Sequence, residues 1–388
     1  MVRNRENSKK ENLLKAEGRD SVPHIVLLAS GGGQRAAVSL VGSLYQMAQD
    51  GLLDSLLYLG GVSGSTWSMA SLYSDPEWSW NMDRAQSRLS GDGVELQDAL
   101  GWLNKTAAED GFSLSDVWGV LTSAGIMKQM DERRLSDEAN RNASNPYPIY
   151  SAVEKHCYSH GPIEGTSWFE VSPHEAGFTE LDLFVNTSLL GSKFQMGDLL
   201  EKKPEMDMIK LQGVCSSCIN LIRDSKAGIR SLAGTQQFNK SVLLRLCFMH
   251  CLTFSIFILP LFWRADSTVP ACLLMEERFQ LVDAGALINV GYPPFLGDKR
   301  DIDLIIAPEY SAGDMFEVLD YAAKVKKPFP VIDDRILEDR DWPKDCYVFD
   351  GKENEPTIIY MPLFNRHNCK GLEHDTVWST AGSICLFS

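Results

Sequence analysis

The sequence has little positive charge, no secretion signal and no regular spacing of cysteines. Its 388 residues include 37 Lys and Arg against 52 Asp and Glu, which gives a formal net charge of −15. A chain with so few cations lacks the basic field that binds phosphates, so we expect no nucleic-acid partner. The polar N-terminus has no apolar core of a signal peptide, and the spacing of the nine cysteines shows no disulfide framework. We therefore expect a cytoplasmic protein.

Two nucleotide-binding signatures are also missing, although a glycine run follows the first apolar segment. Residues 30–38 read SGGGQRAAV and contain neither G-x-G-x-x-G nor G-x-x-x-x-G-K-[ST], which disfavours a nucleotide loop. Glycines let a backbone approach a ligand closely, and the N-terminus of a following helix attracts negative charge. We interpret Gly32 and Gly33 as oxyanion-hole donors, each N–H of which stabilises developing charge by about 3–4 kcal/mol.

A second glycine turn, GVSGS at residues 61–65, follows another apolar run. A serine hydroxyl becomes an effective nucleophile when a tight strand-to-helix turn projects it toward substrate and a base accepts its proton. Ser63 is the candidate nucleophile, although Ser65 stands where the G-x-S-x-G pattern has its last glycine. A purely structural turn before a helix is the alternative interpretation.

The base is harder to find, because none of the seven histidines follows a strand end that would mark a triad base. Asp283 lies at the end of the apolar run FQLV and precedes Ala284 and Gly285. Active sites of α/β proteins collect at the carboxyl ends of strands, so Asp283 is a candidate base. A turn or capping role for Asp283 is the alternative.

Short apolar runs alternate with helical periodicity, which predicts an α/β fold with a central sheet and helices on its faces. The stretch from 75 to 200 is expected to be mixed and mostly helical. The predicted strands are 24–29, 56–59, 279–282, 302–307, 347–349 and 357–361, and the predicted helices are 37–48, 66–73 and 316–323.

Several separated segments together resemble the group IV cytosolic phospholipase A2 family, within the patatin-like hydrolases. After SGGGQR, they are GVSGSTWSMASLYSD (61–75), WFEVSPHEAGF (168–178), GSKFQMG (191–197), FQLVDAGALINVGYP (279–293) and YMPLFN (360–365). The nearest likeness is to the gamma type, which lacks a C2 domain. The resemblance implies that type's catalytic domain: a central mixed sheet with helices on both faces.

The resemblance also implies a phospholipase A2/lysophospholipase that hydrolyses glycerophospholipid acyl esters through an acyl-enzyme. In this likeness Ser63 and Asp283 form a catalytic dyad, and Gly32 and Gly33 form the oxyanion hole. Neither a cofactor nor a metal ligand is implied.

Two arginines match positions of the family that meet the substrate phosphate, Arg35 and Arg300. An arginine at a phosphodiester makes charge-assisted, often bidentate hydrogen bonds. The implied partners are phospholipids and lysophospholipids at an intracellular membrane surface, where we expect peripheral association. Because 23 residues precede the first predicted strand, too few for a C2 sandwich of roughly 100 residues, we expect calcium-independent activity.

The predicted organisation is a flexible lead-in at 1–22, a catalytic domain at 23–370 and an aberrant tail at 371–388. Within the domain, residues 215–275 replace the family's variable segment, and 246–263 contain no Asp, Glu, Lys or Arg. A membrane span, an apolar flap and a buried core segment are the alternatives for 246–263. The final CLFS fits a prenylation signal at Cys385.

Two other functions stay open at this point. Family members continue well beyond PLFN, so a C-terminally truncated, catalytically inactive chain that binds lipid or regulates a relative is one alternative. A membrane-anchored protein that spans the bilayer at 246–263 is the other.

Overall fold

The computed structural model describes residues 22–109, 111–140, 144–155, 157, 168–195, 198–216, 255–256, 273, 279–297, 299–311, 316–324, 327–340, 342–352 and 354–363. Nearly all of the expected lead-in, nearly all of the 215–275 segment and the tail with Cys385 lie outside these ranges. Among the described residues, no helix has the length and apolar character that crossing a bilayer requires.

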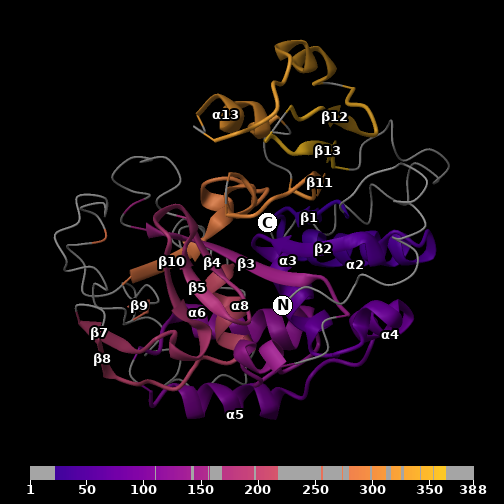
Figure 1. The fold of residues 1–388 in the computed structure, drawn as a ribbon. Coiled ribbons are helices and arrows are strands. Elements are labelled where there is room, and N and C mark those ends of the chain that lie inside the picture. The colour runs from indigo at the N-terminus through magenta and orange to yellow at the C-terminus, as the bar shows by residue number, and fades with distance from the viewer. Residues whose placement is uncertain are drawn as a thin grey trace.

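A mixed sheet of eleven strands forms the centre of the described structure (Figure 1). Its order is β12-β13-β11-β1-β2-β3-β4-β5-β6, with β10 beside β3 and β9 beside β10, while β7 and β8 form a separate hairpin. The strands are β1 (Ile25–Ala29), β2 (Leu56–Gly61), β3 (Tyr147–Glu154), β4 (Trp168–Val171), β5 (Glu175–Phe178), β6 (Leu183–Asn186), β7 (Lys193–Gln195), β8 (Asp198–Glu201), β9 (Ser255–Ile256), β10 (Phe279–Asp283), β11 (Leu304–Pro308), β12 (Tyr347–Phe349) and β13 (Thr357–Met361).

Strand β3 pairs with two different strands along one of its edges. Its first half runs parallel to β2, with Tyr150 opposite Gly61, and its second half runs antiparallel to β10, with Ala152 opposite Asp283. Strand β4 occupies the other edge. The carboxyl ends of β2 and β10 therefore meet head-on beside the middle of β3.

Alternate side chains of β1 enter two apolar layers, one on each face of the sheet. Leu27 and Ala29 lie in one layer with side chains of α2, α3 and α8, whereas Val26 and Leu28 lie in the other with side chains of α13. Burial on both faces is typical of parallel strands covered by helices. The helices are α2 (Gly33–Gln49), α3 (Gly64–Tyr73), α4 (Met82–Leu89), α5 (Leu96–Thr106), α6 (Leu114–Val120), α8 (Met208–Cys215) and α13 (Glu317–Lys324).

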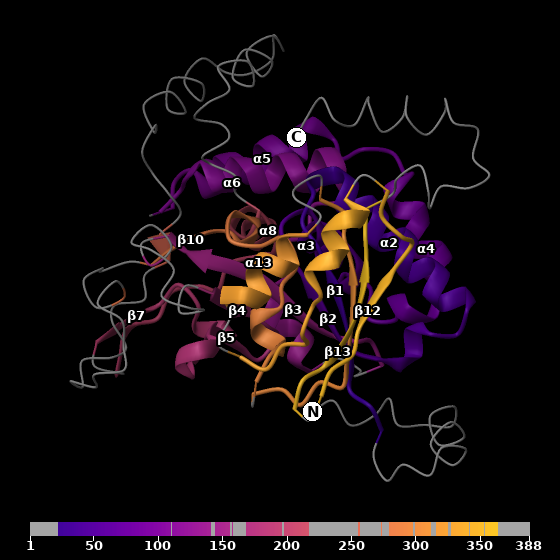
Figure 2. The ribbon, with the colours of Figure 1, turned by 90° about the horizontal axis from the view of Figure 1, so that it is seen from above.

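Further helices extend this packing away from the sheet. Helix α2 packs on α3 and α4, α6 packs on α8, and α5 packs on α6, which forms an outer helical layer (Figure 2). The predicted α/β architecture is confirmed. All six predicted strands are present with ends shifted by at most two residues, and α2 begins earlier than predicted, directly after the glycine run.

The expectation for residues 75–200 is right in its first half and wrong in its second. Helices α4, α5 and α6 occupy the first half, but six strands, β3 to β8, lie between Tyr147 and Glu201. Most of these strands have only three or four residues, and every residue of β8 is exposed. Such short antiparallel strands carry too few alternating apolar residues to be recognised by period alone.

Cysteine pairing also differs from the expectation. Cys157 is disulfide-bonded, whereas Cys215 is a buried free thiol and Cys346 an exposed one. The scattered spacing gave no sign of this bridge, because sequence spacing does not report which cysteines meet in space.

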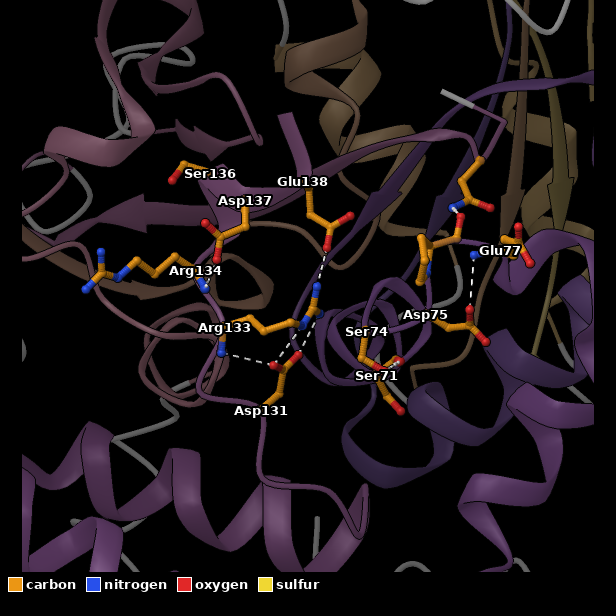
Figure 3. Close-up of polar contacts among 12 residues, drawn as sticks. Ser71, Ser74, Asp75, Glu77, Asp131, Arg133, Arg134, Ser136, Asp137 and Glu138 are labelled. Carbon is orange, nitrogen blue, oxygen red and sulfur yellow. Dashed lines mark hydrogen bonds and ion pairs between the residues drawn. The ribbon is translucent and has the colours of Figure 1, made fainter. Parts of the chain in front are cut away.

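A buried ion cluster anchors the segment that leads from the helices to β3 (Figure 3). The Nε and Nη2 atoms of Arg133 donate to Asp131 at 2.9 and 2.7 Å, and Nη1 donates to Glu138. The two carboxylates are only 6% and 8% exposed. Burial lowers the pKa of Arg133, but hydrogen bonds and charges from Asp131 and Glu138 outweigh it and raise the pKa. The Arg133 carbonyl accepts the N–H of Met208, which ties the cluster to the start of α8.

The substitution Arg133→Met should lower the free energy of unfolding by about 3–5 kcal/mol, because it leaves two buried carboxylates without a cation. Urea denaturation measures the loss. The double variant R133M/D131N should regain part of it, since one of the uncompensated charges is removed. Equal midpoints for the wild type and R133M would contradict this account of the cluster.

Candidate active site

The two strand ends bring Ser63 and Asp283 into direct contact. The Ser63 hydroxyl donates a hydrogen bond of 2.6 Å to Asp283 Oδ2, although 220 positions separate the two residues in the chain. Ser63 is 8% exposed and Asp283 is 5% exposed. The second carboxylate oxygen, Oδ1, accepts the Gly285 N–H at 2.8 Å, which fixes the orientation of the carboxylate. The Ser63 hydroxyl is thus held by a hydrogen bond to a buried carboxylate of fixed orientation.

Ser63 occupies a sharp turn between β2 and α3. Its backbone has φ 52° and ψ −124°, a conformation that non-glycine residues rarely adopt and that costs energy unless the surroundings enforce it. A Cβ atom on Gly64 would lie 2.0 Å from the Gly33 carbonyl oxygen, so only glycine fits there. The turn that carries Ser63 therefore packs directly against the glycine loop.

The glycine loop, residues 30–33, follows the end of β1. Gly32 has φ 139° and Gly33 has φ 60°, and a Cβ on Gly32 would lie 2.6 Å from the Tyr310 carbonyl oxygen. The Gly31 N–H is occupied, because it donates to the Asn289 carbonyl at 2.9 Å. In the described part of the chain, neither Gly32 N–H nor Gly33 N–H has a protein acceptor.

A side chain joins the glycine loop to the turn that contains Ser63. Ser65 Oγ donates to the Ser30 carbonyl at 2.6 Å. Ser65, the residue that departs from the G-x-S-x-G pattern, thus forms a hydrogen bond between the two loops. The N-termini of α2, at Gly33, and of α3, at Gly64, converge here, and their dipoles favour negative charge beside Ser63.

Two further side chains lie beside the site, one near Asp283 and one near the glycine loop. Burial and the nearby Asp283 carboxylate raise the pKa of the Cys215 thiol, so Cys215 stays protonated and is a poor nucleophile. On the side of the glycine loop, Arg35 Nε donates to the Tyr310 carbonyl at 2.6 Å. This bond holds the half-buried Arg35 side chain beside residues 30–33.

Arg300 lies in a different environment from the one expected for a phosphate ligand. Its Nη1 donates to Glu170 at 3.0 Å and to the Pro294 carbonyl at 2.6 Å, and Nη2 pairs with the other oxygen of the fully buried Glu170. The guanidinium also lies 5.8 Å from the centre of the Tyr58 ring, in the middle of β2. Arg300 would have to leave this ion pair to bind a phosphate, so its geometry fits a structural role.

The histidines within the described ranges take no part in the site. His24 contacts the Asp301 carbonyl and His174 stacks on Tyr147, both on the exposed surface. Histidines 156, 160, 250, 367 and 374 lie outside those ranges. No group of three or more His, Cys, Asp and Glu side chains suited to a metal occurs among the residues that the structure describes.

Sequence reasoning missed three residues of the site: Ser65, Asn289 and Glu317, whose carboxylate accepts the Asn289 backbone N–H. Ser65 carried a signal in the broken motif. Asn289 lies six residues after Asp283, and its position beside the glycine loop follows only from the fold.

The substitution Gly64→Ala should destabilise the protein by about 1–3 kcal/mol, because the new methyl group forces the turn away from the Gly33 carbonyl. Gly42→Ala in α2 is the matched control, since a Cβ there meets nothing within 4 Å. The control should gain about 0.5–1 kcal/mol, because alanine is the better helix former. Thermal and urea unfolding of the two variants measure the difference. Equal stabilities would contradict the close approach of the two loops.

The sequence of the chain is similar to those of known proteins. A family model described as lysophospholipase catalytic domain matches residues 25–222. Human cytosolic phospholipase A2 zeta is 30% identical over 93% of the chain, and human cytosolic phospholipase A2 gamma is 26% identical over 91%. The chain spans 52% of the zeta relative and 81% of the gamma relative.

Solved structures agree with this placement. The chain is similar to human GIVD cytosolic phospholipase A2 with a TM-score of 0.74 and 25% identity, over 99% of this chain and 60% of that one. It is also similar to that protein in complex with methyl gamma-linolenyl fluorophosphonate, with a TM-score of 0.66 and 26% identity, over 98% of this chain and 56% of that one. The chain therefore belongs to the cytosolic phospholipase A2 family.

Proposed function

We propose that this chain hydrolyses the acyl esters of phospholipids and lysophospholipids, with Ser63 as nucleophile and Asp283 as base. The observation that carries the proposal is the 2.6 Å hydrogen bond from Ser63 Oγ to Asp283 Oδ2 at the glycine loop. The names of the relatives, phospholipase A2 and lysophospholipase, support the substrate class.

In the first half of the proposed reaction, Ser63 Oγ attacks the ester carbonyl and Asp283 takes the hydroxyl proton. Negative charge develops on the carbonyl oxygen, where the N–H groups of Gly32 and Gly33 can each contribute about 3–4 kcal/mol. The C–O bond to the glycerol side then breaks. Asp283 returns its proton to the leaving alcohol, and the acyl group stays on Ser63.

In the second half, water hydrolyses the acyl-enzyme. Asp283 accepts a proton from the water as its oxygen attacks the acyl carbonyl, and the same amides stabilise the oxyanion. The bond to Ser63 Oγ breaks, the proton returns to that oxygen, and a fatty acid leaves. A base that is already oriented by Gly285 N–H serves both halves without rearrangement.

The substrate phosphate is assigned to Arg35. Its Nε is held by the Tyr310 carbonyl, which leaves the two Nη groups to make the bidentate contact that phosphate favours. The protein groups named here supply each charge that the reaction needs, so we propose that hydrolysis does not require calcium. A peripheral position at an intracellular membrane surface completes the proposal, since the substrates are lipids.

Fluorophosphonates phosphonylate an activated serine, so a fluorophosphonate probe should label the purified wild-type protein. Ser63→Ala should abolish labelling and lower kcat on lysophospholipid on the order of 10⁶-fold. Asp283→Asn keeps the shape of the side chain and removes the base, so it should slow both by about 10²–10⁴-fold. Circular dichroism establishes that both variants are folded.

A folded wild-type protein that is neither labelled nor active would contradict the proposal and favour a non-catalytic lipid-binding chain. Undiminished labelling of Ser63→Ala would place the nucleophile elsewhere.

Lysophospholipid turnover by the wild-type protein should be unchanged when EGTA removes calcium from the assay. A fatty-acid release assay with and without excess calcium measures this directly. A loss of activity in EGTA that calcium restores would show that a metal takes part in binding or chemistry.

A further inference from the structure

Glu317, the first residue of α13, reaches the glycine loop through Asn289. We propose that Glu317 is a positioning residue for the Ser63–Asp283 site: it holds Asn289 so that its backbone fixes the glycine loop and its side-chain oxygen faces the site. The inference rests on the proposed function, because it assigns a role within the same reaction.

The carboxylate of Glu317 accepts hydrogen bonds from both nitrogens of Asn289, the backbone amide and the side-chain amide. Oε1 accepts the Asn289 backbone N–H at 2.7 Å, and Oε2 accepts from Asn289 Nδ2 at 3.2 Å. A carboxylate can only accept hydrogen bonds, so it selects one of the two orientations of the amide. The Asn289 NH₂ group points at Glu317, and Oδ1 must point the other way. Hydrogen bonds to a charged acceptor are also stronger than neutral ones, which favours a rigid arrangement.

The other side of Asn289 touches the parts of the site that carry the chemistry. Its carbonyl oxygen accepts the Gly31 N–H at 2.9 Å. A Cβ atom built on Gly31 would lie 2.9 Å from Asn289 Oδ1 and 3.3 Å from Ser63 Cβ, and one built on Gly285 would lie 3.2 Å from Oδ1. Asn289 Oδ1 thus lies between the glycine loop and the turn that follows Asp283.

Two consequences for the reaction follow from this placement. Because the Gly31 N–H is tied to Asn289, the loop is held where the next amides, those of Gly32 and Gly33, are left for the oxyanion. Because no donor within the described ranges is bonded to Asn289 Oδ1, that oxygen is an acceptor suited to orient the water that attacks the acyl-enzyme. Glu317 touches neither substrate nor reacting atoms and acts through Asn289.

The substitution Glu317→Gln tests the role of the carboxylate. It replaces one acceptor oxygen with an NH₂ group that faces an N–H of Asn289, so one of the two bonds is lost. We expect kcat on lysophospholipid and the rate of fluorophosphonate labelling to fall about 10–100-fold, because misplaced donors lose transition-state stabilisation. KM should stay within about twofold, since Arg35, to which the substrate phosphate is assigned, is untouched. Asp320→Asn, an exposed carboxylate on the same helix, is the matched control and should leave both rates unchanged.

A swap of the two groups separates positioning from a general loss of stability. Asn289→Asp alone places two carboxylates face to face and should be slower than Glu317→Gln. The double variant E317Q/N289D restores a complementary pair, with the Gln amide donating to the Asp oxygen, and should recover most of the labelling rate. The absence of recovery, or rates that simply follow the unfolding midpoints of the variants, would overturn the proposal.

Hydrogen exchange makes the test independent of turnover. The peptide that contains residues 30–38 should exchange faster in Glu317→Gln than in Asp320→Asn. Wild-type activity with unchanged rates and exchange in Glu317→Gln overturns this inference alone. A folded wild type without labelling overturns the proposed function and, with it, the catalytic role of Glu317. The exchange rates then still decide whether Glu317 holds the glycine loop through Asn289.

Discussion

The pairing of β3 with two strands along one edge is the constraint on which the site depends. Strand β2 ends opposite Tyr150 and β10 ends opposite Ala152, so Ser63, which follows β2, lies beside Asp283, the last residue of β10. The hydrogen bond from Ser63 to Asp283 is the direct result. Two side chains that stand at strand ends of a sheet buried on both faces are held in place by the core.

Close packing of backbones around this junction explains the glycines. A Cβ atom on Gly64 would collide with the Gly33 carbonyl oxygen, and one on Gly32 would collide with the Tyr310 carbonyl oxygen, so neither position has room for a side chain. The glycine loop therefore lies between the turn that contains Ser63 and the end of β11. Ser65 bonds the loop from one side and Asn289 from the other. The amides that would receive an oxyanion are consequently preorganised before substrate binds, which is the main source of electrostatic catalysis.

The parts of this account that rest on local signals could be predicted from the sequence. Turn chemistry pointed to Ser63 and to the glycine loop, and strand-end logic pointed to Asp283. The partners of Arg300 could not be predicted, because Glu170 lies 130 positions away and only the fold brings it near. The roles of Glu317 and Asn289 could not be predicted for the same reason. Most of the strands between 147 and 201 were missed because they have only three or four residues and are weakly patterned.

The most direct test of the central claim is to map the site of fluorophosphonate attachment on the wild-type protein by tandem mass spectrometry. The account predicts one phosphonyl group per chain, on Ser63 in the peptide that contains GVSGS. An adduct on another serine, or none on protein that is folded, would contradict the claim that β2 and β10 assemble a working dyad.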